Sequence, residues 1–476
     1  MINIHCKLII ISVHLLREQA MINVLFKRRF FDALVVIILS ALFLVSFIVH
    51  MPVESQKLLF GKTIIHSPVY SDFVANYRSI LMNNYACRDA LANKAVSTTW
   101  FNNDVFKKYC SGSMFYPIPY IHYYIDLPPL TGIVWFISTY TAYITGSHTD
   151  SNPLFSIEGL TIAYIVYSVI MFVSLMFFLY FYRKTLFRRG IVGFKNYLLL
   201  ITLSLVVYGA YGWELFALVF LFIFIYEAIV SKDSIIPYVF LGLFSSAYYL
   251  GLILVIYYLC KFFLNKEAVS NKFLTGLGIG LLPYLVLLLL SPQSVVTWYN
   301  NVLNNLGCNN CIYVFISNNL NDQYLRAIAY VVVSVLFIIY SALLSLEEDP
   351  VIETTIILMI SVVFNIVFLP QTLLILQPLI ILSITRLRDI IAYYSIDILN
   401  SGIILLWFKD YELRKYLEFL GLPPKQSPTT IDSPVQWIAQ MRNILLILFL
   451  LTITMSYINK HREQLRKYIG REAGVA

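Results

Sequence analysis

HSPVYSDFVANYRS at residues 66–79 and FYPIPYIHYYIDLPPLTG at residues 115–132 open and close the most polar stretch of an otherwise apolar chain. Two further aspartates, two cysteines and several basic residues lie between them. Long apolar runs recur from residue 30 to residue 458, so this stretch is held between helices that cross a membrane. A polar segment of this size in such a chain is where we expect the chemistry.

The composition is typical of a helical membrane protein. Of the 476 residues, 59% are hydrophobic and only 13% are charged, and the mean hydropathy is +0.76. A soluble domain would carry about 25% charged residues. We therefore predict an all-α polytopic protein with a single embedded domain over residues 30–460 and about 12 transmembrane helices, within a range of roughly 11–13. The net charge of +8 comes from clusters that flank apolar runs, which indicates contact with lipid head groups rather than with nucleic acid.

Basic residues also predict the orientation of the chain. Lys27, Arg28 and Arg29 precede the first apolar run, which predicts a cytoplasmic segment 1–29 and a large first extracytoplasmic loop over residues 51–128. The last expected outer loop, residues 409–436, reads as a short amphipathic interfacial helix followed by a Pro-rich turn. The remaining expected outer loop is residues 291–323. Residues 461–476 are the expected basic cytoplasmic tail.

The apolar runs leave one conflict in the topology. With simple alternation the basic segment from Arg183 to Lys195 falls outside, against the positive-inside tendency. If it lies inside, one segment between 129 and 230 is re-entrant, or the run at 235–262 is two short helices with a break near Gly251. The runs lie near residues 30–50, 130–146, 157–182, 196–211, 213–230, 235–262, 273–290, 325–345, 351–369, 371–385, 389–408 and 437–458.

Four of the six cysteines fall in the expected outer loops, namely Cys87, Cys110, Cys308 and Cys311. Four cysteines on one side of a membrane are consistent with two disulfides in an oxidising compartment. We expect Cys87 to pair with Cys110. Cys308 and Cys311 either close a tight turn or bridge to another loop. A metal knuckle is the competing interpretation, but it needs two more ligands, and the sequence has no second C-x-x-C and no paired His spacing.

Three carboxylates stand where either helix capping or chemistry would use them. Asp72 begins a helical pattern, so it is an N-cap or a general base at the membrane surface. Asp126 precedes two prolines that suit the first turn of a helix, so it is a cap or a polar group among aromatic platforms for sugar rings or a polyprenyl chain. Glu214 lies at a junction of two apolar runs, where a carboxylate faces a cavity or a partner, or is an ordinary interfacial residue.

The order of these features resembles the GT-C superfamily of integral membrane glycosyltransferases, especially its polyprenyl-phosphate-sugar-dependent, mannosyltransferase-like branch. Asp72 in YSDFVANY matches an acidic residue early in that family's first outer loop. Asp126-Leu-Pro-Pro-Leu130 resembles the Pro-Pro-Leu motif that opens the next span, with Leu127 in place of the usual Tyr. Trp213-Glu214 resembles a Trp-Asp-leading helix, and Leu369-Pro370-Gln371 resembles a late Ser-Pro-Gln segment. The likeness extends from residue 30 to about residue 380.

The resemblance implies transfer of mannose or another hexose from a polyprenyl- or dolichyl-phosphate donor to a lipid-linked or surface glycan acceptor. The reaction would take place on the extracytoplasmic side of the cell membrane, with inversion and with Asp72 as general base. It implies no required cofactor and no metal ligands, and leaves the use of a divalent metal open. Membrane lipids, but not nucleic acid, are the further partners. The expected substrate-binding residues are Tyr70, Tyr77, Arg78, His122, Tyr124, Asp126, Trp213, Glu214, Arg326 and Gln371.

Two other classes of function stay open. A transporter or flippase for lipid-linked glycans predicts paired charges inside the spans and an internal repeat, whereas mid-span charges are few and no repeat is evident. A non-catalytic membrane subunit of a glycosylation complex is the third interpretation. An assay of transfer after replacement of Asp72 distinguishes an enzyme from both.

Overall fold

The fold, taken from a computed structural model, is helical throughout the residues that the structure describes. These are residues 32–65, 71–94, 99–147, 152–191, 199–231, 233–265, 270–304, 308, 310–316, 323–384 and 386–462. Within these ranges the chain forms no strand, and isolated bridges join Tyr123 to Trp100 and Pro119. The expectation of an all-α protein is confirmed for this part of the chain.

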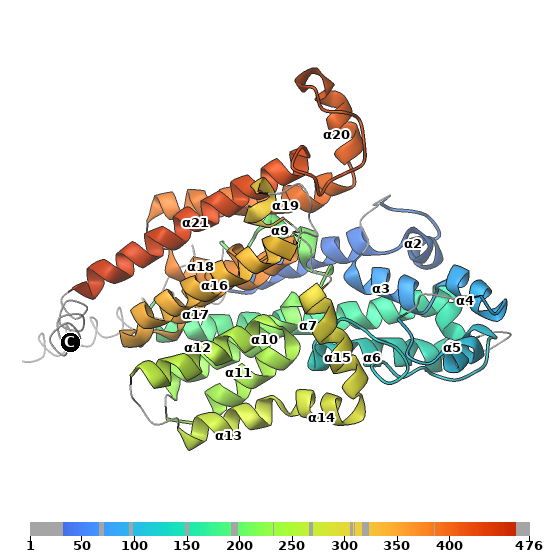
Figure 1. Cartoon of the computed structure of the whole chain (residues 1–476), viewed down its shortest axis with the longest axis horizontal. Coiled ribbons are helices and arrows are strands. Elements are labelled where there is room, and N and C mark those ends of the chain that lie inside the picture. The colour runs from blue at the N-terminus through green and yellow to red at the C-terminus, as the bar shows by residue number, and fades with distance from the viewer. Residues whose placement is uncertain are drawn as a thin grey trace, which may run out of the picture.

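Most helices lie side by side along the long axis of the molecule (Figure 1). The first described helix is Asp32–His50. The others are α2 Val53–Phe60, α3 Asp72–Ile80, α4 Asn84–Leu91, α5 Asn103–Cys110, α6 Pro129–Thr145, α7 Ile157–Arg188, α9 Leu203–Tyr208, α10 Glu214–Val230, α11 Ile236–Ala247, α12 Leu250–Leu264, α13 Asn271–Gly280, α14 Leu282–Leu290, α15 Pro292–Asn304, α16 Gln323–Leu343, α17 Pro350–Val363, α18 Leu373–Ser383, α19 Leu387–Trp407, α20 Asp410–Tyr416 and α21 Pro434–Lys460. Short 3-10 turns include η4 Pro370–Thr372 and η5 Glu418–Leu420.

Several of these helices are long and apolar enough to cross a membrane. Among the described residues they are the helix Asp32–His50 with α7, α16, α19 and α21, and α13 and α14 form a sixth if this pair, bent by 49°, is a single span. Four further apolar helices are shorter: Ile236–Ala247, Leu250–Leu264, Pro350–Val363 and Pro370–Ser383. The described residues do not confirm the expected 12 spans. The chain is therefore a helical membrane protein.

Ion pairs show which helix ends lie together. Asp32 in the first helix pairs with Arg183 near the end of α7. Arg189, which follows α7, pairs with Asp349 before α17 at 2.6 Å. Arg183 therefore lies at the same end of the bundle as the start of the first helix, and Arg189 lies beside the start of α17. We call this end of the bundle the basic end.

The apolar run at 235–262 consists of two helices, α11 and α12. A division of this run into two short helices was one of the two alternatives that the sequence left open. Tyr248 and Tyr249 separate α11 from α12, and Tyr248 is extended, with φ −154° and ψ 131°. Gly251 in the first turn of α12 packs so closely on α11 that a Cβ there would lie 2.4 Å from the Ser245 Cα. The absence of a side chain at Gly251 therefore lets the chain reverse between these helices.

Helix α6 differs from the span expected at 130–146. Trp135 Nε1 donates to the Tyr123 hydroxyl at 2.9 Å, and Tyr116 shares a hydrogen bond of 2.6 Å with Thr139 Oγ1. Just beyond α6, Asn152 Nδ2 donates to the Phe115 carbonyl at 2.9 Å. Because the polar stretch lies along α6 and meets the connection that follows it, α6 belongs to the same end of the molecule as that stretch.

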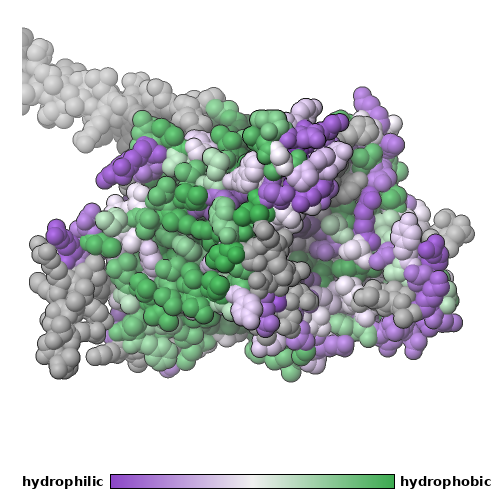
Figure 2. All heavy atoms as spheres, turned by 45° about the horizontal axis from the view of Figure 1, so that its top comes forward, coloured by the Kyte–Doolittle hydropathy of each residue, from purple (hydrophilic) through white to green (hydrophobic). Residues whose placement is uncertain are grey.

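We call the end that holds α2 to α6 the polar end. Hydrophilic atoms gather there, on the right of Figure 2, and hydrophobic atoms cover much of the middle and left of the visible face. Its core is aromatic: the ring of Trp100 lies 4.9 Å from that of Tyr109 and 5.4 Å from that of Tyr123. The long helix α7 starts at this end, where Thr161 Oγ1 donates to Ser55 Oγ at 2.8 Å.

Both disulfides predicted from the sequence are present. Cys87–Cys110 links α4 to α5 within the polar end. Cys308–Cys311 closes a tight turn, which was one of the two alternatives for that pair. The first disulfide confines the loop between α4 and α5, and so stabilises the polar end chiefly by restricting the unfolded chain.

Candidate functional site

Asp72 is positioned by the start of α3. The Ser71 hydroxyl accepts from the Val74 N–H at 3.1 Å and is the helix cap, while the Asp72 N–H donates to the Tyr211 carbonyl at 2.9 Å. Because Ser71 takes the capping role, the Asp72 carboxylate is available for other contacts. Its place in the first turn of α3 suits a negative charge.

Two side chains from distant parts of the sequence hold the Asp72 carboxylate. Gln371 Nε2 donates to Asp72 Oδ2 at 3.1 Å, and the Tyr211 hydroxyl also hydrogen-bonds to the carboxylate. The Asp72 side chain is only partly exposed. Burial raises the pKa of Asp72 to about 6, against the opposing effect of the two hydrogen bonds. Asp72 is thus a carboxylate that ionises just below neutral pH.

A second carboxylate, Glu214, lies close enough to Asp72 for their charges to interact. It begins α10 and is buried. The Tyr248 hydroxyl donates to Glu214 Oε1 at 3.3 Å and shares a 3.1 Å hydrogen bond with Thr372, while Glu214 Oε2 has no hydrogen-bond partner in the described part of the chain. Gly212 leaves the space for this carboxylate, because a Cβ there would lie 2.3 Å from Glu214 Oε2.

A network behind η4 holds the segment that carries Gln371. Asn400 Nδ2 donates to the Pro370 carbonyl at 2.9 Å, and Arg442 Nη1 donates to Asn400 Oδ1 at 2.8 Å. The guanidinium of Arg442 lies 3.6 Å from the centroid of the Phe368 ring. Arg442 is fully buried in α21, where a charged side chain is expensive. These contacts hold Phe368 and Pro370, and so help to position the neighbouring Gln371.

Asp126 lies in a separate cluster. The Tyr124 hydroxyl donates to Asp126 Oδ1 at 2.9 Å, and Tyr249 also hydrogen-bonds to this carboxylate. Burial raises the pKa of Asp126, and both hydrogen bonds oppose the shift. Beside it is a pocket of about 380 Å³, lined chiefly by aromatic and aliphatic side chains: Tyr120, Tyr124, Ile125, Leu127, Pro129, Tyr249, Tyr284, Leu287, Ser294, Val295 and Trp298.

An apolar groove adjoins this aromatic pocket. Its empty volume is about 640 Å³, and it shares Tyr120, Pro129 and Leu287 with the pocket. Its other lining residues come from the segment before α6, from α6 and from around α14: Ile118, Pro119, Ile121, Gly132, Ile133, Phe136, Pro283, Val286, Leu290 and Ser291. The pocket, which is rich in aromatic side chains, and the groove, which is mostly aliphatic, are therefore adjacent.

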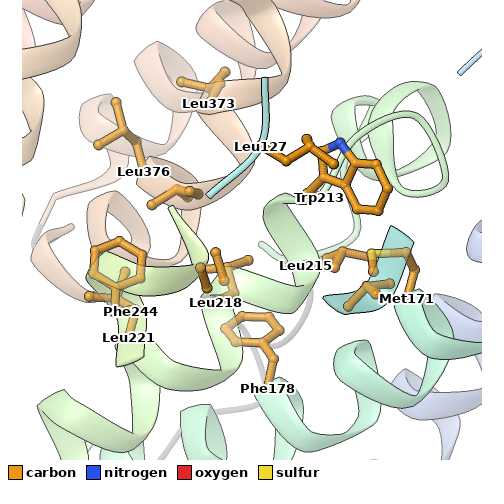
Figure 3. Packing of buried hydrophobic residues seen from close by; sticks show 14 of the residues in the cluster. Leu127, Met171, Phe178, Trp213, Leu215, Leu218, Leu221, Phe244, Leu373 and Leu376 are labelled. Atoms are coloured by element: carbon orange, nitrogen blue, oxygen red, sulfur yellow. The ribbon is translucent and has the colours of Figure 1, made fainter. Parts of the chain in front are cut away.

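The consecutive residues Tyr248 and Tyr249 connect the two clusters, because the first contacts Glu214 and the second contacts Asp126. Leu127, next to Asp126, and Trp213 both belong to the buried hydrophobic core, part of which is drawn in Figure 3. The motifs around residues 72, 126, 213 and 371 therefore converge at the polar end. Glu214, Trp213 and Gln371 come together with Asp72, and Tyr124 accompanies Asp126.

Other expected binding residues lie apart from these clusters or serve the packing. Arg78 pairs with Glu54 at 2.9 Å. Tyr77 is fully buried in the core, and its hydroxyl has no hydrogen-bond partner among the described residues. His122 Nδ1 accepts from the Ile118 N–H at 2.8 Å, which closes a turn. Arg326 lies in the first turn of α16. Tyr70 lies outside the described residues.

Sequence reasoning missed Tyr211, Tyr248, Tyr249 and Thr372 as parts of the site. The signal for the paired tyrosines is present in the sequence, since they sit at the break predicted near Gly251. Nothing local distinguishes Tyr211 or Thr372 from other polar residues next to apolar runs. The described residues include no group of three or more His, Cys, Asp or Glu side chains that could hold a metal ion.

Comparison of the chain with protein-family models, with curated proteins and with solved structures finds no match.

Proposed function

We propose that this chain is a membrane glycosyltransferase that transfers a hexose, such as mannose, from a polyprenyl- or dolichyl-phosphate donor. The acceptor is a lipid-linked or surface glycan on the extracytoplasmic side, and the transfer inverts the anomeric centre with Asp72 as general base. The Asp72 carboxylate carries the proposal: it is partly exposed, its pKa is raised to about 6, and it binds Gln371, 299 residues away in the chain.

The raised pKa suits a general base. At pH 7 a carboxylate of this kind is mostly ionised, yet it accepts a proton more readily than an ordinary aspartate. In the proposed reaction Asp72 takes the proton of the acceptor hydroxyl as that oxygen attacks the anomeric carbon. The phosphate of the donor leaves from the opposite face of the sugar.

The neighbours of Asp72 support the binding of a sugar. Gln371 and Tyr211 orient the carboxylate. Glu214 Oε2 is a buried acceptor without a hydrogen-bond partner among the described residues, and a sugar hydroxyl would satisfy it. The aromatic pocket beside Asp126 suits the apolar face of a sugar ring, and the groove along α6 and α14 suits an isoprenoid chain.

The test is an assay of the purified full-length protein with a radiolabelled polyprenyl-phosphate hexose. Asp72→Asn keeps the size of the side chain and removes the base, so transfer is expected to fall by about 10²–10⁴-fold. Asp104→Asn, an exposed carboxylate at the start of α5, is the matched control and is expected to leave transfer unchanged. Undiminished transfer by Asp72→Asn would sink the proposal.

A further inference from the structure

The connection between α19 and α21 forms an arm that stands away from the body. It covers residues 408–433 and includes α20 and η5. In Figure 1 it projects crosswise to α21, beyond the outline of the bundle. Neither the proposed site nor the proposed reaction uses this arm.

The arm is held rigid by one fully buried arginine. Arg414 Nε donates to Asp410 Oδ2 at 2.9 Å, and its Nη1 donates to Asp432 Oδ2 at 2.8 Å. Arg414 Nη2 also donates to the Ser427 carbonyl at 3.0 Å. Asp410 in turn accepts from the Ser427 N–H at 2.8 Å and from the Ser433 hydroxyl at 2.6 Å. The outgoing and returning halves of the arm are therefore joined by charge-assisted hydrogen bonds.

The tip of this rigid arm is apolar and exposed. Tyr416 is 82% exposed, Phe419 is 79% exposed and Leu420 is 57% exposed. They lie within the five residues before Gly421, whose φ of +79° turns the chain back. A large aromatic cluster presented at the end of a braced arm is unusual for a surface in contact with water alone, and such patches mark interaction sites.

The positions of two tryptophans indicate that the base of the arm lies at the membrane surface. It joins the end of one long apolar helix to the start of another, and Trp407 and Trp437 stand at those two ends. Tryptophans at helix ends are typical of the interface between lipid and water. Because the arm leaves the bundle sideways from this depth, its tip extends over the lipid that surrounds the bundle.

The charge of the arm favours uncharged contacts with that lipid. Residues 409–433 contain four basic and four acidic residues, so their net charge is zero. Ion pairs occupy most of them: Arg414 with Asp410 and Asp432, Lys425 with Asp432, and Lys409 with Glu412. Attraction to anionic head groups is therefore weak, and burial of the aromatic tip is the driving force.

We propose that the arm of residues 408–433 is an interfacial anchor whose tip, formed by Tyr416, Phe419 and Leu420, inserts into the lipid interface next to the bundle. The two helices that the arm joins also carry exposed apolar residues, among them Leu405 on α19 and Ile444 on α21. This inference does not depend on the proposed glycosyl transfer.

The test places a spin label on the tip of the full-length protein in phosphatidylcholine nanodiscs. Phe419→Cys is labelled in a background with Cys6 and Cys260 replaced by Ser, and Asp104→Cys at the polar end is the control. Collision with oxygen relative to a water-soluble nickel complex is expected to be several-fold higher at 419 than at 104. The difference should persist at high salt, because the insertion is apolar.

Two outcomes would overturn the anchor. A label at 419 that collides with the nickel complex as freely as the label at 104 places the tip in water. A label shielded from both oxygen and nickel places the tip against protein, and cross-linking between labelled chains would then identify a second copy of this chain as the occupant. Tyr416→Cys provides an independent second position if the variant at 419 does not fold.

Discussion

At the scale of single residues, burial and hydrogen bonding have opposite effects on the pKa of Asp72. Two donors stabilise its ionised form, yet burial outweighs them and its pKa rises from 3.8 to about 6. Sequence reasoning singled out Asp72 and left open whether it caps α3. It could not decide, because the answer depends on Ser71 taking the cap and on Tyr211 and Gln371 arriving from other parts of the chain.

Asp72→Asn is expected to stabilise the folded protein while it lowers transfer by about 10²–10⁴-fold. A folded-state pKa above the unfolded value means that the folded state binds more protons between pH 3.8 and about 6, so this group loses stability as pH rises through that range. Above pH 6 the full cost is present, and removing the charge should recover about 1–3 kcal/mol. Thermal unfolding in detergent at pH 7.5 measures this gain.

The pH profile gives the control for that prediction. Well below pH 3.8, at about pH 3 or lower, Asp72 is protonated in both states, so the variant and the wild type should unfold at similar temperatures. Transfer by the wild type should rise about tenfold per pH unit up to pH 6 and then level off. A variant that is less stable than the wild type at pH 7.5 would contradict the assigned pKa.

At the scale of helices, the sequence pattern located most elements, but it did not predict how α6 packs against the rest of the chain. The break in the run at 235–262 was an alternative that Gly251 suggested, and it is present as the join between α11 and α12. The run at 130–146 was expected to cross the membrane, whereas α6 packs along the polar stretch. Composition could not predict this, because 17 residues rich in aromatic and β-branched side chains suit either setting.

Gly251→Ala is expected to damage both carboxylate clusters at once. The added Cβ would lie 2.4 Å from the Ser245 Cα and N, which are backbone atoms that cannot move alone. Separation of α11 from α12 would displace Tyr248 and Tyr249 from Glu214 and Asp126. We expect a loss of about 1–3 kcal/mol in stability, seen as a lower unfolding temperature in detergent.

Gly278→Ala in α13 is the matched control, because a Cβ at this helical glycine meets no atom within 4 Å. It should be neutral or slightly stabilising, since alanine favours a helix over glycine. Equal effects of the two substitutions would show that the close approach at Gly251 has no special importance.

At the scale of the whole molecule, an ion pair shows which helix ends lie at the same end of the bundle. The pairing of Asp32 with Arg183 places the end of α7 beside the start of the first helix. The sequence alone could not decide at which end of the bundle the basic residues after α7 lie. Hydropathy locates apolar runs, but it does not show which of them extend from one end of the bundle to the other. The convergence of Asp72, Trp213 and Gln371 was likewise expected only from the order of motifs, and it depends on how α3, α10 and η4 pack.

We predict that the basic end faces the cytoplasm and the polar end faces outward. In a background with Cys6 and Cys260 replaced by Ser, Asp104→Cys should react with a membrane-impermeant maleimide on intact cells. Arg188→Cys, exposed at the end of α7, should react only after the cells are permeabilised. Labelling of both positions from the same side would contradict the arrangement.

The hydrogen bond between Gln371 and Asp72 also constrains the order of events during synthesis. The ribosome makes the aspartate 299 residues before the glutamine, an interval of about 15–60 s at ordinary rates of translation. For that whole time the polar end can fold and oxidise Cys87 with Cys110, but its carboxylate lacks the Gln371 amide. A nascent chain released before residue 371 would have a finished polar end and an incomplete site. Quality control at the membrane would therefore have to recognise the missing later helices, because the early region looks complete.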